Sequence, residues 1–333
     1  MNKLVSIITP CYNGESFVRR FLDSVLNQTY DNIELYFVND GSTDRTEEIV
    51  LPYIEKFSQK GYELIYIKQK NAGQSAAINK GLERFRGYYM TWIDSDDYLL
   101  PEAIKRKVEF MDSNPNIGLC ICKVNVVEDK SFRIISTQQR IPPKGNDDFF
   151  SDLIRGKNVF YTPGGYMVRS SMFRAAMPEP LQIQTPREIG QNFQLLLPIS
   201  YKFPVGYINE MLFNYTVRAG SHSRVKHTFE EELRISGIGR DVLLNILADI
   251  KPIDEERKRI TCLIEERYIC RGLTLMKLYG RKEKLKEYIT RAKNLGVYTQ
   301  TVKSLELELR CPIIAIKNKF KRLLKRFANK LKN

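Results

Sequence analysis

The chain has 333 residues, six cysteines, two histidines and a formal net charge of +14. It contains no run of eighteen or more apolar residues, so the sequence predicts no membrane-spanning helix. Without a CxxC pair or a Cys/His cluster, the composition argues against a zinc site and a disulfide framework. The cysteines are therefore expected to be small buried side chains.

The basic excess is concentrated in the C-terminal third of the sequence. Residues 225–333 hold 26 Lys/Arg and 14 Asp/Glu, whereas residues 1–224 hold 27 and 25. The two parts are therefore expected to have different partners. The N-terminus lacks the long apolar segment and cleavage site of a signal peptide, so we expect a cytoplasmic protein.

The first hundred residues alternate between short β-branched apolar segments and segments with helical spacing of apolar residues. Strands are predicted within residues 4–13, 32–40, 63–69 and 88–94, and helices within residues 15–28, 44–57 and 74–85. Asp44 is placed to cap the second helix. Strands alternating with helices predict an α/β fold with a parallel sheet covered on both faces.

The pattern is less regular from about residue 115 to residue 220. A strand pair is expected at 117–129 and 132–137, and a strand that leads into a helix at 164–176. The segment "NFQLLLPISYKF" is expected to be helical up to Pro198, and residues 206–217 are expected to form a strand. Helical spacing dominates after residue 225.

Polar segments follow three of the predicted strands: "TPCYN", "NDGSTD" and "DSDD". In open α/β sheets, ligands bind beyond the carboxyl ends of the strands, so this placement indicates a functional site. The last segment brings Asp94, Asp96 and Asp97 within four positions. Carboxylates are the ligands that Mg²⁺ and Mn²⁺ prefer. The alternative is a helix start, with Ser95, Asp96 and Asp97 at the positive end of a helix dipole.

Asp40, in "VNDGSTD", is open to two interpretations. The first is an ordinary turn residue, since "DGS" turns are common. The second follows from its place after the second strand, where its carboxylate would accept hydrogen bonds from a base or a ribose.

Three segments in order resemble the family 2 glycosyltransferases, which have the GT-A fold. They are "VSIITPCYNGESFVRRFLDSVLNQTYDNIELYFVNDGSTDRT", "NAGQSAAINKGL" and "GYYMTWIDSDDYLLPEA". The resemblance is continuous over about the first hundred residues and extends more weakly to about residue 224. The last hundred residues are not covered by it.

The resemblance implies a Rossmann-like, mostly parallel sheet and transfer of a sugar from a nucleoside diphosphate sugar, usually with inversion. Thr9, Pro10 and Tyr12 match the loop that holds the nucleobase, and Asp40 matches the acid that hydrogen-bonds the base, most often uracil. Asp94, Ser95 and Asp96 match the acid-x-acid motif that meets the ribose and a divalent metal, Mn²⁺ or Mg²⁺, with Asp96 closest to the metal.

The sequence departs from the family pattern at the catalytic base. Relatives carry the base as the Asp of a "GED" motif, but this chain has Gln191 and Asn192 where the Glu and the Asp would fall. An amide cannot take the proton of an acceptor hydroxyl. Glu188 lies four residues earlier and is our candidate base. The alternative for Glu188 is a solvated acid beside Arg187.

Two further departures concern the diphosphate. Arg218 stands where relatives often have a His, with His222 following, and a guanidinium suits a diphosphate clamp. A surface arginine is the alternative. Ile78 stands where many relatives have an Arg, so one phosphate contact is absent.

The C-terminal segment 311–333 predicts a basic amphipathic helix. Residues 310–333 contain nine Lys/Arg and no acid, with apolar residues at helical spacing. Such a helix suits an anionic membrane surface, where enzyme and lipid-linked acceptor would meet. Packing against the chain's own domain is one alternative. Nucleic-acid binding is another, but no recognition motif supports it.

The sequence therefore predicts a GT-A domain at 1–224, with a nucleotide-binding half at about 1–112 and an acceptor half at about 113–224, followed by a helical region at 225–333. The predicted function is metal-dependent transfer from a nucleoside diphosphate sugar, with uridine as nucleotide, to a glycan or lipid-linked acceptor at the inner face of the membrane. Two rivals stay open: a nucleotide-sugar-binding protein without catalysis, and a basic helical module that binds a membrane or nucleic acid.

Overall fold

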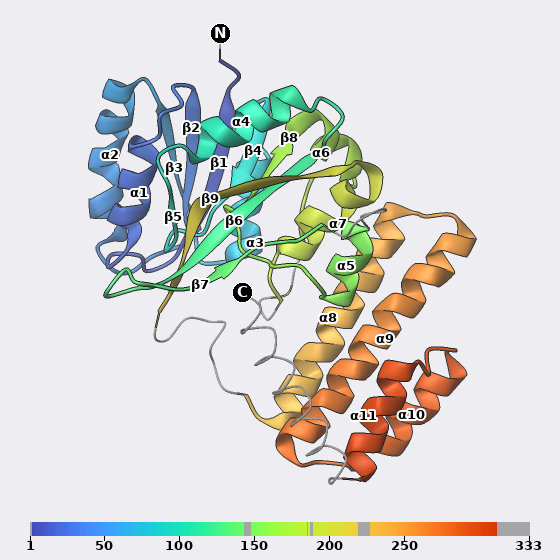
Figure 1. Cartoon of the computed structure of the whole chain (residues 1–333). Helices are drawn as coiled ribbons and strands as arrows, with labels where there is room; N and C mark the ends of the chain where they lie inside the picture. Colours follow the sequence, from blue (N-terminus) through green and yellow to red (C-terminus); the bar gives the residue numbers. More distant parts are fainter. Residues whose placement is uncertain (1, 143–147, 185, 187–188, 219–226, 312–333) are drawn as a thin grey trace, which may run out of the picture. The chain divides into compact units, whose positions relative to one another are not determined.

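The chain forms two compact units, Met1–Val225 and Lys226–Asn333 (Figure 1). The computed structural model describes residues 2–142, 148–184, 186, 189–218 and 227–311. The first unit is an α/β domain and the second is helical, so the predicted fold class is confirmed.

Four parallel strands form one half of the sheet, in the order β3-β2-β1-β4. Every residue of β1, β2 and β4 is buried, which explains their continuous apolar, β-branched sequences. Helices follow the first three strands, as the spacing predicted. The bounds of these elements are β1 (Val5–Cys11), α1 (Val18–Leu26), β2 (Ile33–Asn39), α2 (Thr46–Lys60), β3 (Glu63–Lys68), α3 (Gln74–Leu82) and β4 (Tyr89–Trp92).

The other half of the sheet continues from β4 in the order β8-β6-β9-β5, with β7 beside β6. Strand β8 is antiparallel to both β4 and β6, and β9 is parallel to β6. Strands β6 and β9 therefore run in the same direction as β1 to β4, and the sheet is mostly parallel by direction. The bounds are β5 (Tyr98–Leu99), α4 (Ala103–Ser113), β6 (Leu119–Glu128), β7 (Ile134–Gln138), α5 (Phe149–Arg155), β8 (Tyr166–Arg169), α6 (Ser170–Ala176), α7 (Asn192–Lys202) and β9 (Val205–Val217).

Helix α7 does not end at Pro198, so that expectation was wrong. The helix continues to Lys202 with Pro198 inside it. Proline removes one backbone hydrogen bond from a helix. Leu195, Leu196 and Ile199 are fully buried here, and this apolar contact on both sides of the proline outweighs the lost bond.

Two other local expectations need correction. Helix α2 begins at Thr46 with Arg45 as its N-cap, and Asp44 lies one residue outside. The Asp44 carboxylate still accepts a hydrogen bond from the Thr46 N–H at 3.0 Å and another from the Glu15 N–H at 2.9 Å. Asp44 therefore links the segment before α1 to the start of α2, instead of capping α2 alone.

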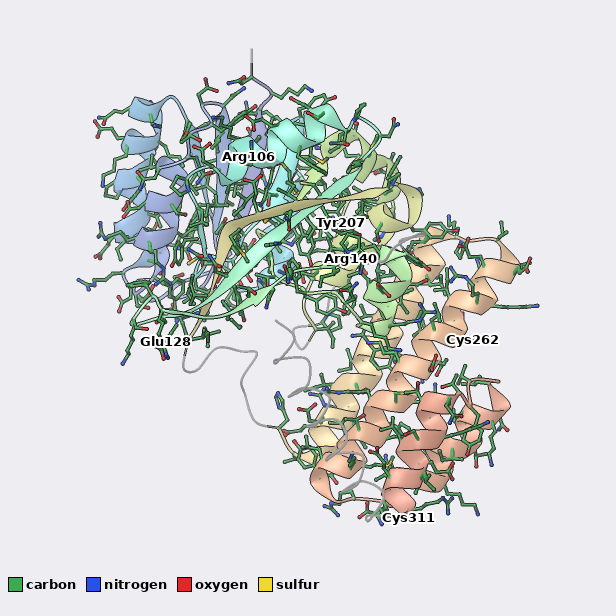
Figure 2. The ribbon with its side chains drawn as sticks, viewed as in Figure 1. Arg106, Glu128, Arg140, Tyr207, Cys262 and Cys311 are labelled. Atoms are coloured by element: carbon green, nitrogen blue, oxygen red, sulfur yellow. The ribbon has the colours of Figure 1, made fainter. Side chains whose placement is uncertain are left out.

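The cysteines are not all buried. Cys11, Cys120 and Cys122 are, as expected, but Cys262 and Cys311 are exposed (Figure 2). The buried three belong to strands β1 and β6, whereas Cys262 lies on a helix of the second unit and Cys311 follows its last described helix. A helix exposes one side to solvent, so a cysteine there is not forced inward.

The second unit consists of α8 (Phe229–Ile250), α9 (Asp254–Tyr279), α10 (Leu285–Asn294) and α11 (Gln300–Arg310) over its described residues. Thr228 and Glu231 form a capping box at the start of α8. Leu273 and Met276 of α9 pack with Ala292 of α10 and Val302 of α11 in a buried apolar core. None of the helices within the described residues combines the length and the apolar composition that crossing a bilayer requires.

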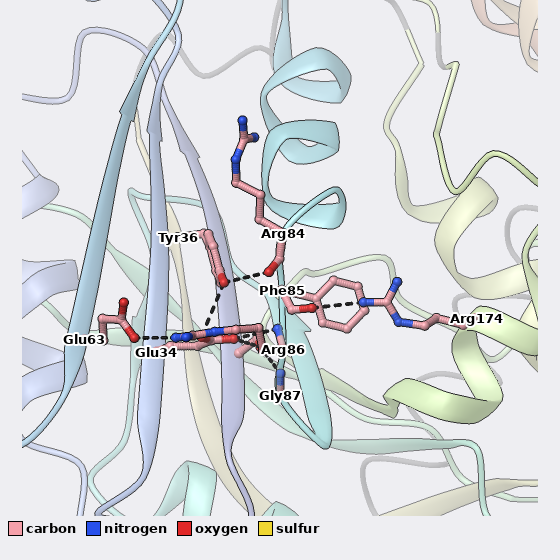
Figure 3. A network of polar contacts seen from close by, with 9 residues as sticks. Glu34, Tyr36, Glu63, Arg84, Phe85, Arg86, Gly87 and Arg174 are labelled. Atoms are coloured by element: carbon pink, nitrogen blue, oxygen red, sulfur yellow. Dashed lines mark hydrogen bonds and ion pairs between the residues drawn. The ribbon is translucent and has the colours of Figure 1, made fainter.

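A buried carboxylate fixes the amino-terminal edge of the parallel strands. Glu34, near the start of β2, is fully buried and accepts hydrogen bonds from Ser6 Oγ at 2.5 Å and from the Arg86 backbone N–H at 2.8 Å. The Arg86 guanidinium donates two more, at 2.9 and 2.7 Å, and also pairs with Glu63 on β3 (Figure 3). The network ties β1, β2 and β3 to the segment that leads into β4.

Removing Arg86 is expected to destabilise the first unit strongly. Arg86→Ala leaves the Glu34 carboxylate buried without its counter-charge, and breaking such a pair costs about 3 kcal/mol, the low end of the usual range because water reaches the guanidinium. Glu63→Gln is the matched control, since that pair is exposed and contributes at most about 1 kcal/mol. Urea unfolding of both variants measures the difference. Equal losses would show that Glu34 does not depend on Arg86.

Candidate functional site

Three loops meet at the carboxyl edge of the parallel strands. They follow β1, β2 and β4. The strand register pairs Cys11 at the end of β1 with Asn39 at the end of β2, and it pairs Ile8 of β1 with Trp92 at the end of β4. The Asp40 N–H donates to the Cys11 carbonyl oxygen at 2.8 Å. The structure therefore brings the three predicted polar segments together at one edge of the sheet.

The loop after β1 contains the residues expected to hold a nucleobase. Thr9 and Pro10 are buried, and the Thr9 hydroxyl has no hydrogen-bond partner among the described residues. The Tyr12 side chain is 49% exposed. Asn13 accepts a hydrogen bond from the Thr43 N–H at 2.9 Å, which joins this loop to the one after β2. An aromatic ring is thus presented to solvent from a fixed loop, an arrangement that suits stacking on a base.

Asp40 is more than a simple turn residue. Its carboxylate is buried and accepts hydrogen bonds from Gln69 Nε2 at 2.7 Å and from the N–H groups of Ala72 and Gly73, both at 2.8 Å. Asp40 therefore holds the segment that leads into α3. Its oxygens lie at the edge where the three loops converge, and any contact with a base would be made from this fixed position.

Asp94, Asp96 and Asp97 form a compact acidic cluster at the end of β4. One carboxylate oxygen from each lies within 4.8 Å of the others. Burial and the neighbouring Asp96 charge raise the pKa of Asp94 to about 7, although the hydrogen bond from Gln74 lowers it. Burial, with the charges of Asp96 and Asp94, also raises the pKa of Asp97 well above its ordinary value. The pKa values of Asp94 and Asp97 are thus raised, because negative charges lie close together in a buried site.

Asp97 supplies the observation that favours a cation over a structural role. The side chain is 0% exposed, and its Oδ1 accepts a hydrogen bond from the Thr216 N–H at 2.7 Å. Its Oδ2 is buried without a partner among the described residues. A buried orphan oxygen in an all-carboxylate set fits a hard divalent cation such as Mn²⁺ or Mg²⁺. The helix-start alternative is wrong, because β5 (Tyr98–Leu99) follows the cluster and α4 begins only at Ala103.

Arg218 reaches this cluster from the end of β9. Its Nε and one terminal nitrogen donate to Asp96 Oδ2 at 3.1 and 2.6 Å, and its guanidinium lies 4.2 Å from the centre of the Phe17 ring. With 26% of its side chain exposed, Arg218 is not a surface arginine. The structure therefore places it at the site, in contact with the acid that is expected to be closest to a metal.

Arg20, on α1, is a residue that the sequence interpretation missed. It donates to the Asp96 carbonyl oxygen at 2.8 Å and to Asp129 at 3.2 Å. Its guanidinium lies 5.2 Å from the Tyr98 ring and 5.3 Å from the Phe132 ring. Arg20 thus joins the acidic loop to the hairpin between β6 and β7. Nothing in the local sequence marks it, since it is one of two adjacent arginines on an amphipathic helix.

A hydrogen bond between Ser95 and Cys11 joins the acidic loop after β4 to the end of β1. Ser95 is buried, and burial raises the pKa of the Cys11 thiol to about 12, with a hydrogen bond from Ser95 opposing the shift. The thiol is therefore neutral at physiological pH and is unsuited to nucleophilic attack. It acts as a small packing group beneath the acidic loop.

Asn192, at the position of the family's base, has a structural contact instead. It is the first residue of α7, and its Oδ1 accepts a hydrogen bond from Trp92 Nε1 at 2.8 Å. Its Nδ2 donates to the Tyr161 carbonyl oxygen at 2.7 Å. The amide thus satisfies one donor and one acceptor at once, which a carboxylate cannot do. Gln191 is also buried.

The remaining residues of the sequence analysis are Ile78 and a group outside the described residues. Ile78 is 1% exposed on α3 and belongs to the apolar core. The candidate base Glu188, its neighbour Arg187, His222 and the basic segment 312–333 lie outside the described residues.

Comparison with known proteins gives one family. The model for glycosyl transferase family 2 matches residues 6–176. Glycosyltransferase GlyA of Streptococcus pneumoniae is 32% identical over 228 residues, which is 66% of this chain and 32% of that protein. An uncharacterized glycosyltransferase of Rickettsia typhi is 37% identical over 129 residues, 38% of each protein. The match thus spans only about a third of the length of these curated relatives.

Solved structures share the fold. TarS of S. aureus in complex with UDP-GlcNAc superposes with a TM-score of 0.61 at 17% identity, covering 92% of this chain and 91% of that chain. The mannosyltransferase PcManGT of Pyrobaculum calidifontis, in complex with GDP-Man and Mn²⁺, gives a TM-score of 0.54 at 15% identity, covering 96% and 88%. At these identities the likeness concerns the GT-A fold alone.

Proposed function

This chain belongs to glycosyl transferase family 2, and on that premise we propose that it transfers a sugar from a nucleoside diphosphate sugar to a hydroxyl of a glycan or lipid-linked acceptor. The observation that carries the proposal is the acidic cluster, where three carboxylates converge and Asp97 Oδ2 is buried with no hydrogen-bond partner in the part of the chain that the structure describes. Uridine is the proposed nucleotide. The bound ligands of TarS and PcManGT, a UDP-sugar and a GDP-sugar with Mn²⁺, are compatible with this site class.

In this proposal, residues of the three loops would share the binding of the donor. Tyr12 would stack on the base and Asp40 would accept its N–H, while Asp94 would meet the ribose. Asp96, with Asp94, would hold the divalent cation. When bound, such a cation stabilises the negative charge that develops on the departing diphosphate. Arg218 would add a charge-assisted contact to the same diphosphate.

The reaction needs a base on the face of the sugar opposite the diphosphate. Attack from that face inverts the anomeric centre through an oxocarbenium-like state, by analogy with glycoside hydrolysis. Glu188 is the proposed base, since Asn192 is an amide committed to Trp92 and Tyr161. Its carboxylate would take the proton of the acceptor hydroxyl as the new bond forms.

Calorimetric titration with UDP, GDP, ADP and CDP, each with and without Mn²⁺, tests the proposal directly. We expect one nucleotide, UDP, to bind with a Mn²⁺-dependent affinity at least about tenfold above the others, because Asp94 and Asp96 would hold a cation whose charge favours the diphosphate. Absence of binding by every nucleotide would overturn the function.

One rival keeps the fold without the chemistry. In this rival the chain binds a nucleotide sugar but has no catalytic base, because an amide stands at the family's base position. Sugar transfer to an acceptor, or slow hydrolysis of the UDP-sugar to UDP, distinguishes the two: the rival binds the donor and leaves it intact.

We also propose that the protein works at the inner face of the cell membrane. The basic segment 311–333 supports this, since basic side chains near an anionic surface contribute about 1 kcal/mol each. Deleting residues 312–333 is expected to lower binding to vesicles rich in phosphatidylglycerol at least about a hundredfold, with UDP affinity unchanged. Equal vesicle binding by the truncated protein would contradict the proposal. Salt-sensitive binding of DNA or RNA, lost on deletion, would indicate a nucleic-acid-binding segment instead.

A further inference from the structure

The metal site proposed above already contains a positive charge from the chain itself. The Arg218 guanidinium donates through two nitrogens to one oxygen of Asp96, at 3.1 and 2.6 Å. Asp96 is one of the three acids of the cluster, and one of its carboxylate oxygens lies within 4.8 Å of an oxygen of Asp94 and an oxygen of Asp97. Arg218 is thus the cation that partly neutralises the three acids in this structure.

Contact with the Phe17 ring and partial burial of the Arg218–Asp96 pair hold Arg218 in this position. The Phe17 ring lies 4.2 Å from the guanidinium carbon, an attractive cation–π arrangement, and both charged side chains are only about a quarter exposed. Arg20, by contrast, binds the backbone carbonyl of Asp96 and leaves its carboxylate alone. Of the two arginines, only Arg218 therefore contacts a carboxylate oxygen of the proposed metal site, Asp96 Oδ2.

We propose that Arg218 is an internal competitor of the divalent metal, which the nucleoside diphosphate removes. A metal that binds Asp96 through Oδ2 competes with the guanidinium for that oxygen. A diphosphate offers Arg218 a stronger, bidentate anionic partner and releases Asp96 to the metal. Metal and nucleotide then bind cooperatively, and the Arg218 side chain couples the affinity for one to the binding of the other. This inference rests on the proposed function and extends it to the order and coupling of ligand binding.

The consequence is a pair of opposite effects on one variant. Arg218→Gln removes the competitor, so Mn²⁺ alone is expected to bind about fivefold more tightly. The same variant loses a diphosphate contact, so UDP at saturating Mn²⁺ is expected to bind about tenfold more weakly. Linkage requires that the enhancement of Mn²⁺ affinity by UDP falls by the same factor as the enhancement of UDP affinity by Mn²⁺. A role limited to folding would not produce opposite signs.

The experiment measures Mn²⁺ binding to the full chain by electron paramagnetic resonance and UDP binding by calorimetry. Arg218→Lys keeps the charge and is expected to retain competition, with Mn²⁺ affinity within about twofold of the native protein. Arg84→Gln, an exposed arginine on the loop after α3, is the matched control and should change neither affinity. Far-UV circular dichroism and a thermal melt verify that each variant is folded.

The outcomes separate this inference from the function on which it rests. Tighter Mn²⁺ binding with weaker UDP binding in Arg218→Gln supports it. Unchanged or weaker Mn²⁺ binding in that variant overturns the competition and leaves the donor site intact. Absence of Mn²⁺ binding by both proteins, in the presence and absence of UDP, overturns the metal site and the competition together.

Discussion

Replacing Asp96 with asparagine is expected to abolish metal-dependent nucleotide binding and to lower sugar transfer about a thousandfold. The substitution keeps the size of the side chain but removes the charge from one of three acids whose oxygens lie within 4.8 Å of one another. A metal at a departing diphosphate contributes several kcal/mol to the transition state, which corresponds to a loss of this size. Calorimetry with UDP and Mn²⁺, together with transfer assays, measures both effects.

The control for Asp96 is an exposed acid on a loop far from the cluster. Asp31 lies in the segment before β2, at the opposite edge of the sheet, and Asp31→Asn should leave UDP binding and turnover unchanged. If Asp96→Asn binds UDP and Mn²⁺ as the native protein does, the acidic cluster is not the metal site, and the proposed donor geometry is wrong.

Replacing Glu188 with glutamine is expected to lower turnover by about a hundredfold to ten-thousandfold and to leave UDP affinity unchanged. A positioned general base contributes a factor of this size, and an amide cannot accept the proton. Steady-state transfer assays give the turnover number, and calorimetry gives the nucleotide affinity. A lower turnover number with an unchanged nucleotide affinity identifies a base, because replacing a donor-binding residue would change both quantities.

Two further variants give that result a sharp contrast. Glu179→Gln changes an exposed acid nearby in the sequence and should have no effect. Asn192→Asp restores the family's residue type, but the new carboxylate would face the Tyr161 carbonyl oxygen, so we expect lower stability, by about 1–3 kcal/mol, and no gain in turnover. Full activity in Glu188→Gln, or a rise in activity in Asn192→Asp, would show that Glu188 is not the base.

The sequence was informative where a local pattern alone decides structure. The strands β1 to β4 and the helices between them were predicted from short buried segments alternating with amphipathic ones, because a parallel sheet buries both faces of its strands. The convergence of the "TPCYN", "NDGSTD" and "DSDD" loops followed from the same pattern, since carboxyl ends of parallel strands share one edge.

The local pattern misled where tertiary contacts decide. The acidic cluster resembled a helix start, but pairing of Tyr98 and Leu99 with β9 places a strand there first. Pro198 resembled a helix end, but the buried leucines before it and the buried Ile199 after it keep α7 continuous. In both cases a contact more than a hundred residues away, or a packed core, outweighs the preference of the local sequence.

The sequence by itself determined the fold class, the three polar loops and the acidic composition of the last of them, because these depend on residue types and on the period of apolar residues. Only the tertiary structure placed Arg218 on Asp96, Arg20 on the same loop, and Asn192 between Trp92 and Tyr161. Arg218 and Asp96 are 122 residues apart in the sequence, Arg20 and Asp96 are 76 apart, and Asn192 and Trp92 are 100 apart. Which side chains meet across such separations depends on strand order and packing, and those physical factors leave no periodic trace in one sequence.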